Sequence, residues 1–129
     1  MAGRSVPADE LALVRRWFEA FNRRDLAATL ALAHPQIAFR PLQLHGAETW
    51  HGRAGVEALW EQMFRVGLDH RVEIDRVELL PDGGYAAIGR VKPGDADFVA
   101  VMRLQDGLVR EARHVFSDED TLRGLGLTG

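Results

Sequence analysis

Residues 11–21, LALVRRWFEAF, constrain the fold more than any other stretch of this chain. Their apolar side chains recur at helical spacing, at Leu11, Val14, Trp17, Phe18 and Phe21. The charged residues between them fall on the opposite side, so one face of the predicted helix is a wide aromatic stripe. A stripe of this size needs a second layer to cover it.

The helical segments end at recognisable capping residues. Pro7 and the acidic residues after it suit the first turn of the aromatic helix, which we expect to end near Asn22, with residues 1–6 as a loose arm. Asp25 is placed to cap a second, short helix over 26–33, which Pro35 ends. Helical spacing returns over 54–66, which predicts a third helix.

The remaining segments read as strands. Residues 37–44 alternate, with Ile37 and Phe39 on one side and Ala38, Arg40 and Leu42 on the other. Four further strands, 71–80, 85–92, 97–105 and 108–116, are separated by short turns and therefore predict antiparallel hairpins. The predicted fold class is α+β, with a curved antiparallel sheet wrapped around the N-terminal helix and three helices in all.

Composition limits the functional classes. The 129 residues fit one domain, 1–129, whose residues 124–129 we expect to form a flexible tail. A net charge of −3 with scattered arginines argues against nucleic-acid binding. The absence of cysteine excludes disulfides and thiol nucleophiles, and without an apolar run of membrane-spanning length we expect a cytoplasmic protein with no membrane partner.

Three stretches resemble the nuclear transport factor 2 superfamily and, within it, SnoaL-like domains. They are WFEAFNRRDLAATLALAHPQIAF at 17–39, HGRAGV at 51–56 and VREARHVFSDEDTLRGLGL at 109–127. The resemblance implies a cone-shaped α+β barrel around a cavity. It leaves the activity open, because the superfamily includes isomerases, polyketide cyclases, dehydratases, epoxide hydrolases and binding modules.

The ketosteroid isomerases of this superfamily use a tyrosine, a carboxylate base and a protonated aspartate. The resemblance puts Trp17, Arg40 and Ala100 at these three positions. An indole does not relay a proton as a phenol does, a guanidinium stays protonated, and a methyl group does neither. The sequence therefore excludes the mechanism of the ketosteroid isomerases. What the resemblance still implies is the cavity that members of the superfamily share.

The resemblance also implies which side chains line that cavity. Two are candidate catalytic residues, His114 and Arg40, and the implied ligand pocket around them comprises Trp17, Phe21, Leu42, Leu59, Trp60, Met63, Ile88, Arg90, Phe98, Met102, Ala112 and Phe116.

Each polar candidate has a structural alternative. Alternation puts His114 on one face with Ala112 and Phe116, the face that the resemblance turns inward, where a histidine can act as acid or base; a neighbouring side chain can equally satisfy it. Arg40 inside the cavity would favour an acidic ligand, unless Glu61, Asp97 or solvent takes its charge. Trp17, Phe21 and Trp60 also suit a core, and Arg90 also suits the solvent.

No cofactor or metal is predicted. The segment GLGLTG at 124–129 matches the dinucleotide-binding pattern in letters only, because that pattern works between a strand and a helix. The five histidines show no paired ligand spacing.

Two functions from different classes remain. One is a cyclase, isomerase or dehydratase acting on a small aromatic or alicyclic carbonyl compound or acid, and the other is a non-catalytic binding or dimerisation module. We also expect a homodimer through the outer sheet face, where an apolar patch would otherwise be exposed, formed by Val99, Val101, Val109 and Val115.

Overall fold

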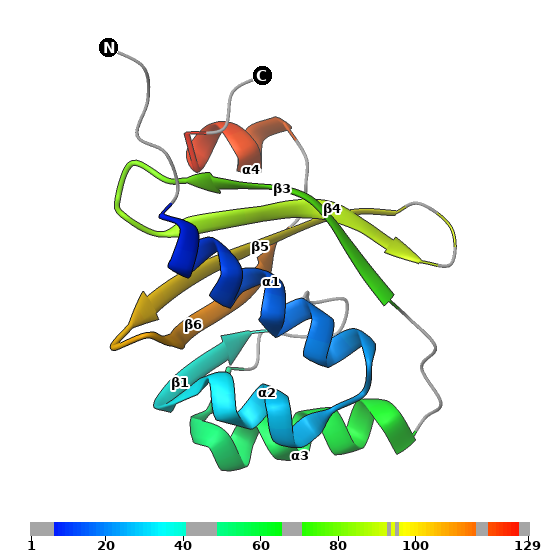
Figure 1. Ribbon diagram of the computed structural model, residues 1–129. Coiled ribbons are helices and arrows are strands. Elements are labelled where there is room, and N and C mark those ends of the chain that lie inside the picture. Colours follow the sequence, from blue (N-terminus) through cyan, green and yellow to red (C-terminus); the bar gives the residue numbers. More distant parts are fainter. Residues whose placement is uncertain are drawn as a thin grey trace.

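The computed structural model describes residues 7–40, 49–65, 71–92, 94, 96–115 and 119–126 (Figure 1). Within them the elements follow the order α1 (Ala8–Asn22), α2 (Leu26–Leu32), β1 (Ala33–Arg40), β2 (Trp50–His51), α3 (Gly52–Arg65), β3 (Arg71–Leu79), β4 (Tyr85–Lys92), β5 (Ala96–Gln105), β6 (Leu108–Val115) and α4 (Glu119–Gly124). None of the helices in these ranges has the length and apolar character needed to cross a membrane.

The strands form one curved sheet in the order β2-β1-β6-β5-β4-β3. This confirms the predicted α+β class. The sheet is mixed, because β1 runs parallel to β6 while the other neighbouring strands are antiparallel. β1 also begins at Ala33, directly after α2, so Pro35 lies inside the strand, in a region of irregular register with β6. A proline has no N–H for a regular ladder, which accounts for the irregularity at this point.

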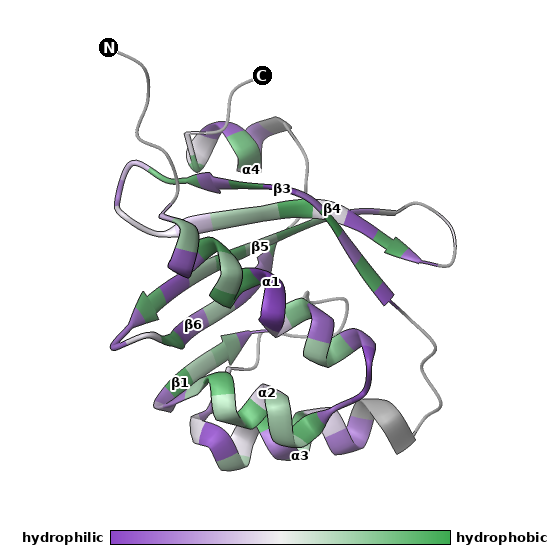
Figure 2. Ribbon diagram, in the orientation of Figure 1, coloured by the Kyte–Doolittle hydropathy of each residue, from purple (hydrophilic) through white to green (hydrophobic). Residues whose placement is uncertain are grey.

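Helix α1 crosses the concave face of the sheet (Figure 1), and Figure 2 shows both hydrophobic and hydrophilic segments along its length. Its buried side chains include Leu13, Val14, Trp17 and Phe18, which confirms the aromatic stripe as a core face. The end of α1 is tied to Val72 of the edge strand β3 by two hydrogen bonds. The side-chain amide of Asn22 donates to the backbone carbonyl of Val72 and accepts from its backbone N–H, at 2.8 Å each. The capping of α2 by Asp25 is likewise as predicted, with its carboxylate accepting from the backbone three residues on.

Helix α4 covers the convex face of the sheet, on the side away from α1 (Figure 1). Its Leu122 packs on an apolar cluster that includes Val99 and Val101, each 1% exposed. Val109 belongs instead to the core under α1. The exposed valine patch that motivated a dimer is therefore absent from the described residues, because α4 covers Val99 and Val101 while Val109 faces the core under α1. Dimerisation through this face stays a prediction for light scattering.

At Gly89 the strands β4 and β3 approach each other closely. Register shifts between Ile74 and Arg76 in the neighbouring β3, and a Cβ placed on Gly89 would lie 1.8 Å from the backbone oxygen of Glu73. Only a residue without a side chain fits here. The β5–β6 turn has a different requirement, since Asp106 and Gly107 both have positive φ, as a two-residue hairpin turn demands.

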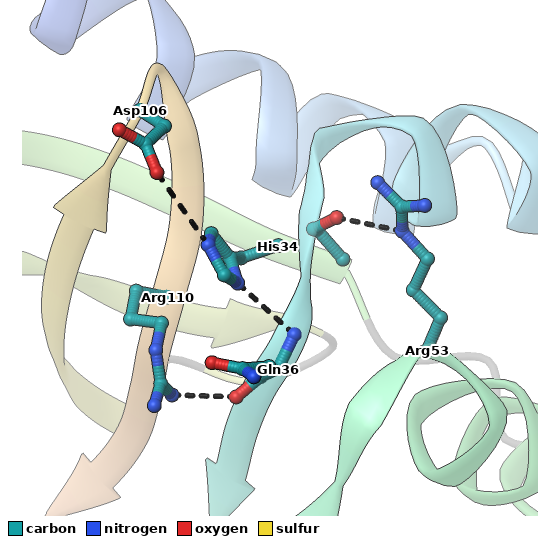
Figure 3. Close-up of polar contacts among 6 residues, drawn as sticks. His34, Gln36, Arg53, Asp106 and Arg110 are labelled. Atoms are coloured by element: carbon teal, nitrogen blue, oxygen red, sulfur yellow. Dashed lines mark hydrogen bonds and ion pairs between the residues drawn. The ribbon is translucent and has the colours of Figure 1, made fainter.

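Polar contacts hold the first half of β1 where its ladder with β6 is irregular (Figure 3). His34 Nδ1 accepts from the backbone N–H of Gln36 at 3.0 Å, and its Nε2 lies 3.7 Å from a carboxylate oxygen of Asp106. Arg110 on β6 donates to the backbone carbonyl of Gln36, and Arg53 on α3 donates to the carbonyl of the first residue of β1. These bonds replace part of the missing ladder and fix β1 between β6 and α3.

Candidate functional site

Three aromatic rings from three elements meet between the helices and the sheet. Trp17 of α1 lies edge-on to Trp60 of α3 with ring centroids 6.0 Å apart, and Phe39 of β1 lies 5.0 Å from Trp60 and 6.4 Å from Trp17. Each of the three residues is 2% exposed. Phe21 extends the group, with its ring 5.6 Å from that of Trp60. The aromatic stripe of α1 is thus completed by one ring from α3 and one from β1.

Trp60 carries a polar atom without a partner. Its Nε1 is buried and forms no hydrogen bond within the described part of the chain. Leaving a buried N–H unpaired costs about 1–3 kcal/mol, so the indole is a donor available to an acceptor that reaches it.

His114 stands between two aromatic rings on the concave face of the sheet. Its imidazole lies 5.3 Å from the ring of Phe39 and 4.7 Å from that of Phe98, and Ala100 is its register partner on β5. Part of the residue remains accessible to solvent. The packing nevertheless removes water from the imidazole, and this burial lowers the pKa of His114 to about 4. The imidazole is therefore neutral at physiological pH.

A neutral imidazole is able to accept a proton or a hydrogen bond. The ring of Phe39 touches both His114 and Trp60, so the two polar groups flank one apolar surface. The site combines a base and an N–H donor in water-poor, aromatic surroundings.

Several residues that the sequence assigned to the pocket lie on the concave side with His114. Leu59, Phe98, Met102 and Ala112 are buried in the core cluster under α1, and Phe21 packs against it. Met63 lies in α3, but its side chain is outside the described part of the structure, as are residues Leu42 and Phe116.

Three assigned residues lie on the other side, which corrects the predicted lining. Arg40 is exposed and alternates with the buried Phe39. Ile88 packs on the convex cluster beneath α4. Arg90 follows two positions on and pairs with Glu73 and Asp75. The expectation that these three face the interior is wrong. In β1 and β4 the residues next to them in sequence, such as Phe39 and Ala87, are the ones that face the core under α1.

The structure therefore does not bring Arg40 and His114 together. Arg40 instead lines a groove of about 220 Å³ on the convex face, formed by Ala38, Arg40, Thr49, Glu111, Ala112 and Arg113. The ion pairs that the sequence offered as alternatives for Arg40, with Glu61 or Asp97, are not among its contacts within the described residues.

A second groove, of about 300 Å³, lies between the start of α1 and the β5–β6 turn. Its walls are Asp9, Glu10, Leu13, Arg16, Leu104, Gln105, Asp106 and Gly107. The Tyr85 hydroxyl donates to the Glu10 carboxylate beside it. Sequence reasoning missed this groove, since its two sides are about 95 residues apart and no local pattern joins them. Among the described residues no three histidine or acidic side chains are grouped to hold a metal ion.

Sequence reasoning also passed over Phe39 and Arg113. Phe39 was recognisable, because it lies on the same side of its strand as Ile37, and that side is the more apolar one. Arg113 gave no such signal, since it lines the same groove as Arg40 only because the two residues are register partners on β6 and β1.

Fold and site together define an α+β cone with an aromatic interior, and comparison with known proteins agrees. The sequence profile of the SnoaL-like domain family matches residues 14–112. The chain belongs to the SnoaL-like domain family. No curated protein matches it in sequence.

Solved structures of the same fold are similar at low identity. An NTF2-like protein of unknown function from Burkholderia pseudomallei has a TM-score of 0.68 and 21% identity, covering 92% of this chain and 98% of its own. A proposed polyketide cyclase from Sinorhizobium meliloti has a TM-score of 0.69 and 12% identity, covering 85% and 95%. TerC, co-crystallised with polyporic acid, has a TM-score of 0.70 and 17% identity, covering 92% and 98%. At these identities the likeness concerns the fold.

Proposed function

We propose that this domain binds a small aromatic or alicyclic carbonyl compound against its interior aromatic surface. The observation that carries the proposal is the pair of polar groups beside Phe39: a Trp60 N–H without a partner and a neutral His114. A carbonyl oxygen accepts from the indole, and flat apolar rings replace water against the aromatic walls. The partial exposure of His114 supports entry of the ligand from that side.

The reaction that these groups suit is proton abstraction next to the carbonyl. His114 takes the proton as general base, and the Trp60 N–H stabilises the negative charge that develops on the oxygen. A base with a pKa of about 4 is unprotonated at neutral pH and has a strength close to that of the carboxylate base used by ketosteroid isomerases. This reaction class covers isomerases, cyclases and dehydratases. With Arg40 on the convex face, the interior favours neutral carbonyl compounds over acids.

Binding is measured by the fluorescence of the interior tryptophans, with cyclic ketones compared against hydrocarbons of the same ring size. Trp60→Phe keeps an aromatic wall and removes the donor, so it is expected to weaken ketone binding roughly threefold to tenfold without affecting the hydrocarbon. If Trp60→Phe weakened the binding of both ligands equally, the Trp60 N–H would not be the donor to the ketone oxygen. Polyporic acid, found with the structural neighbour TerC, serves as the acidic comparison in the panel and is expected to bind less tightly than the neutral ketones.

Catalysis is measured separately, by NMR of deuterium exchange next to the carbonyl in D2O. His114→Gln is expected to abolish exchange of a bound ketone, and exchange that continues at the wild-type rate would exclude His114 as the base.

The second candidate function is a binding module without a reaction. The direct packing of Trp17, Phe39 and Trp60, each almost fully buried, favours it, because filled aromatic space leaves less room for a reacting substrate. Saturable ketone binding without measurable exchange in the wild-type protein would select this alternative.

A further inference from the structure

The groove on the convex face of β1 and β6 lies behind the interior site. Arg40 and Arg113 line it, together with Thr49 and Glu111. The chain neighbours of the two arginines, Phe39 and His114, point to the concave side. The sheet therefore separates the groove from the aromatic interior.

Two like charges stand side by side in this groove. Arg40 and Arg113 are register partners on the parallel strands β1 and β6. Positive charges directly opposite each other destabilise a strand pair unless something negative compensates them. Neither guanidinium has an ion pair or hydrogen bond within the described part of the chain.

Arg113 has the stronger requirement for a partner. Its Nε is buried and unpaired among the described residues, although a charged N–H is among the most costly groups to leave unsatisfied. Two nearby arginines do have partners: Arg103 on β5 pairs with Asp82, and Arg110 on β6 donates to a backbone carbonyl.

Glu111 does not neutralise the pair. It lines the groove, but its carboxylate oxygen lies 3.8 Å from the Nε of Arg103 on the neighbouring strand. Arg103 is shared between this carboxylate and that of Asp82, so Glu111 sets at most one negative charge against the two guanidinium groups, and the groove keeps an excess of positive charge.

We propose that this groove binds a small oxyanion with two negative charges, best matched by a phosphoryl group. Guanidinium groups present planar forks of N–H donors that match phosphate oxygens, and two forks balance a dianion where one would suffice for a carboxylate. Arg113 supplies its buried Nε–H, Arg40 contributes from the exposed rim, and Thr49 carries a hydroxyl at the wall. A volume of about 220 Å³ accommodates such a group.

The test is a titration with inorganic phosphate, followed through backbone and arginine Nε resonances by NMR at constant ionic strength and pH 8. Phenyl phosphate, added in a parallel arm, distinguishes free phosphate from a phosphoryl group carried by an organic molecule, and acetate serves as the single-charge probe. We expect saturable shifts at Arg40, Arg113 and Thr49, with phosphate at least tenfold tighter than acetate.

Three variants assign the binding. Arg40→Gln, at an exposed position, is expected to weaken phosphate binding about tenfold to a hundredfold. Arg113→Lys keeps the charge and removes the Nε donor and the fork, and is expected to cost about tenfold. Arg76→Gln makes the same change of charge on β3, where Arg76 pairs with Glu78, and is expected to leave the affinity unchanged.

Non-saturating shifts, an affinity for acetate equal to that for phosphate, or an equal loss in Arg76→Gln would each overturn the proposal, because they would reduce the effect to net charge. Wild-type affinity in folded Arg113→Lys would exclude the buried Nε as a ligand. Circular dichroism of each variant verifies that it is folded.

Discussion

Acid is expected to weaken this fold through one residue, His114. In the unfolded chain this imidazole has a pKa near 6.5, whereas burial lowers its pKa to about 4 in the folded chain. Between these values the unfolded state binds more protons, so stability is complete above pH 6.5 and is lost as the pH falls towards 4.

The magnitude follows from the shift. At roughly 1.4 kcal/mol per pKa unit, protonation of His114 removes about 3 kcal/mol of unfolding free energy by pH 4 and about 2 kcal/mol by pH 5. Both figures are large against the total stability of roughly 5–15 kcal/mol typical of domains.

The assay is urea denaturation of the wild type and His114→Phe between pH 7.5 and pH 5. Phenylalanine keeps a ring between Phe39 and Phe98 and does not titrate, while the carboxylates common to both proteins cancel in the difference. The wild type should lose about 2 kcal/mol more than the variant over this range. His51→Gln, which removes an exposed imidazole on β2, is the control and should follow the wild type.

Parallel stability curves for the wild type and His114→Phe would refute the reasoning, because they would mean that the imidazole is solvated in the folded protein. An equal change of slope in His51→Gln would refute the assignment to His114.

Three further predictions concern stability and are measured by urea denaturation at pH 7.5. Trp17→Ala should cost about 3–5 kcal/mol by emptying a buried aromatic site, and a loss under about 1 kcal/mol would contradict its place in the core. Gly89→Ala should cost about 3 kcal/mol or more, because its Cβ would overlap the backbone of Glu73, whereas the control Gly124→Ala meets no atom within 4 Å and should be neutral or stabilising; equal effects would contradict the close approach. Asn22→Ala should cost about 1–3 kcal/mol by leaving one N–H and one carbonyl of β3 unpaired, and an unchanged stability would show that water replaces both bonds.

The local signals in the sequence were strong enough to predict the elements. The aromatic stripe of α1, the Asp25 cap and the Asp106-Gly107 turn each depend on a few neighbouring residues, and the structure confirms all three. Pro35 was expected to end a helix over 26–33; α2 ends at Leu32, and Pro35 lies in β1, which begins at Ala33, before the predicted start of the strand.

The face of each strand was predicted less well, and the reason is physical. Alternation sorted residues 37–40 correctly into two sets, and the more apolar set, with Ile37 and Phe39, is the buried one. The resemblance to the isomerases instead turned Arg40 inward. A slip of one residue in such a placement exchanges the two faces of a strand completely.

The sequence by itself determined the fold class, the family and the side chains available for chemistry, because helical and strand periods and capping residues are local properties. Only the tertiary structure decided where that chemistry lies. The sheet is covered on both sides, by α1 and by α4, so hydrophobicity alone does not tell the concave from the convex face of β4 and β5. The pairing of β1 with β6 joins Arg40 to Arg113 across more than 70 residues of sequence, and a contact of that range is set by packing of the whole sheet.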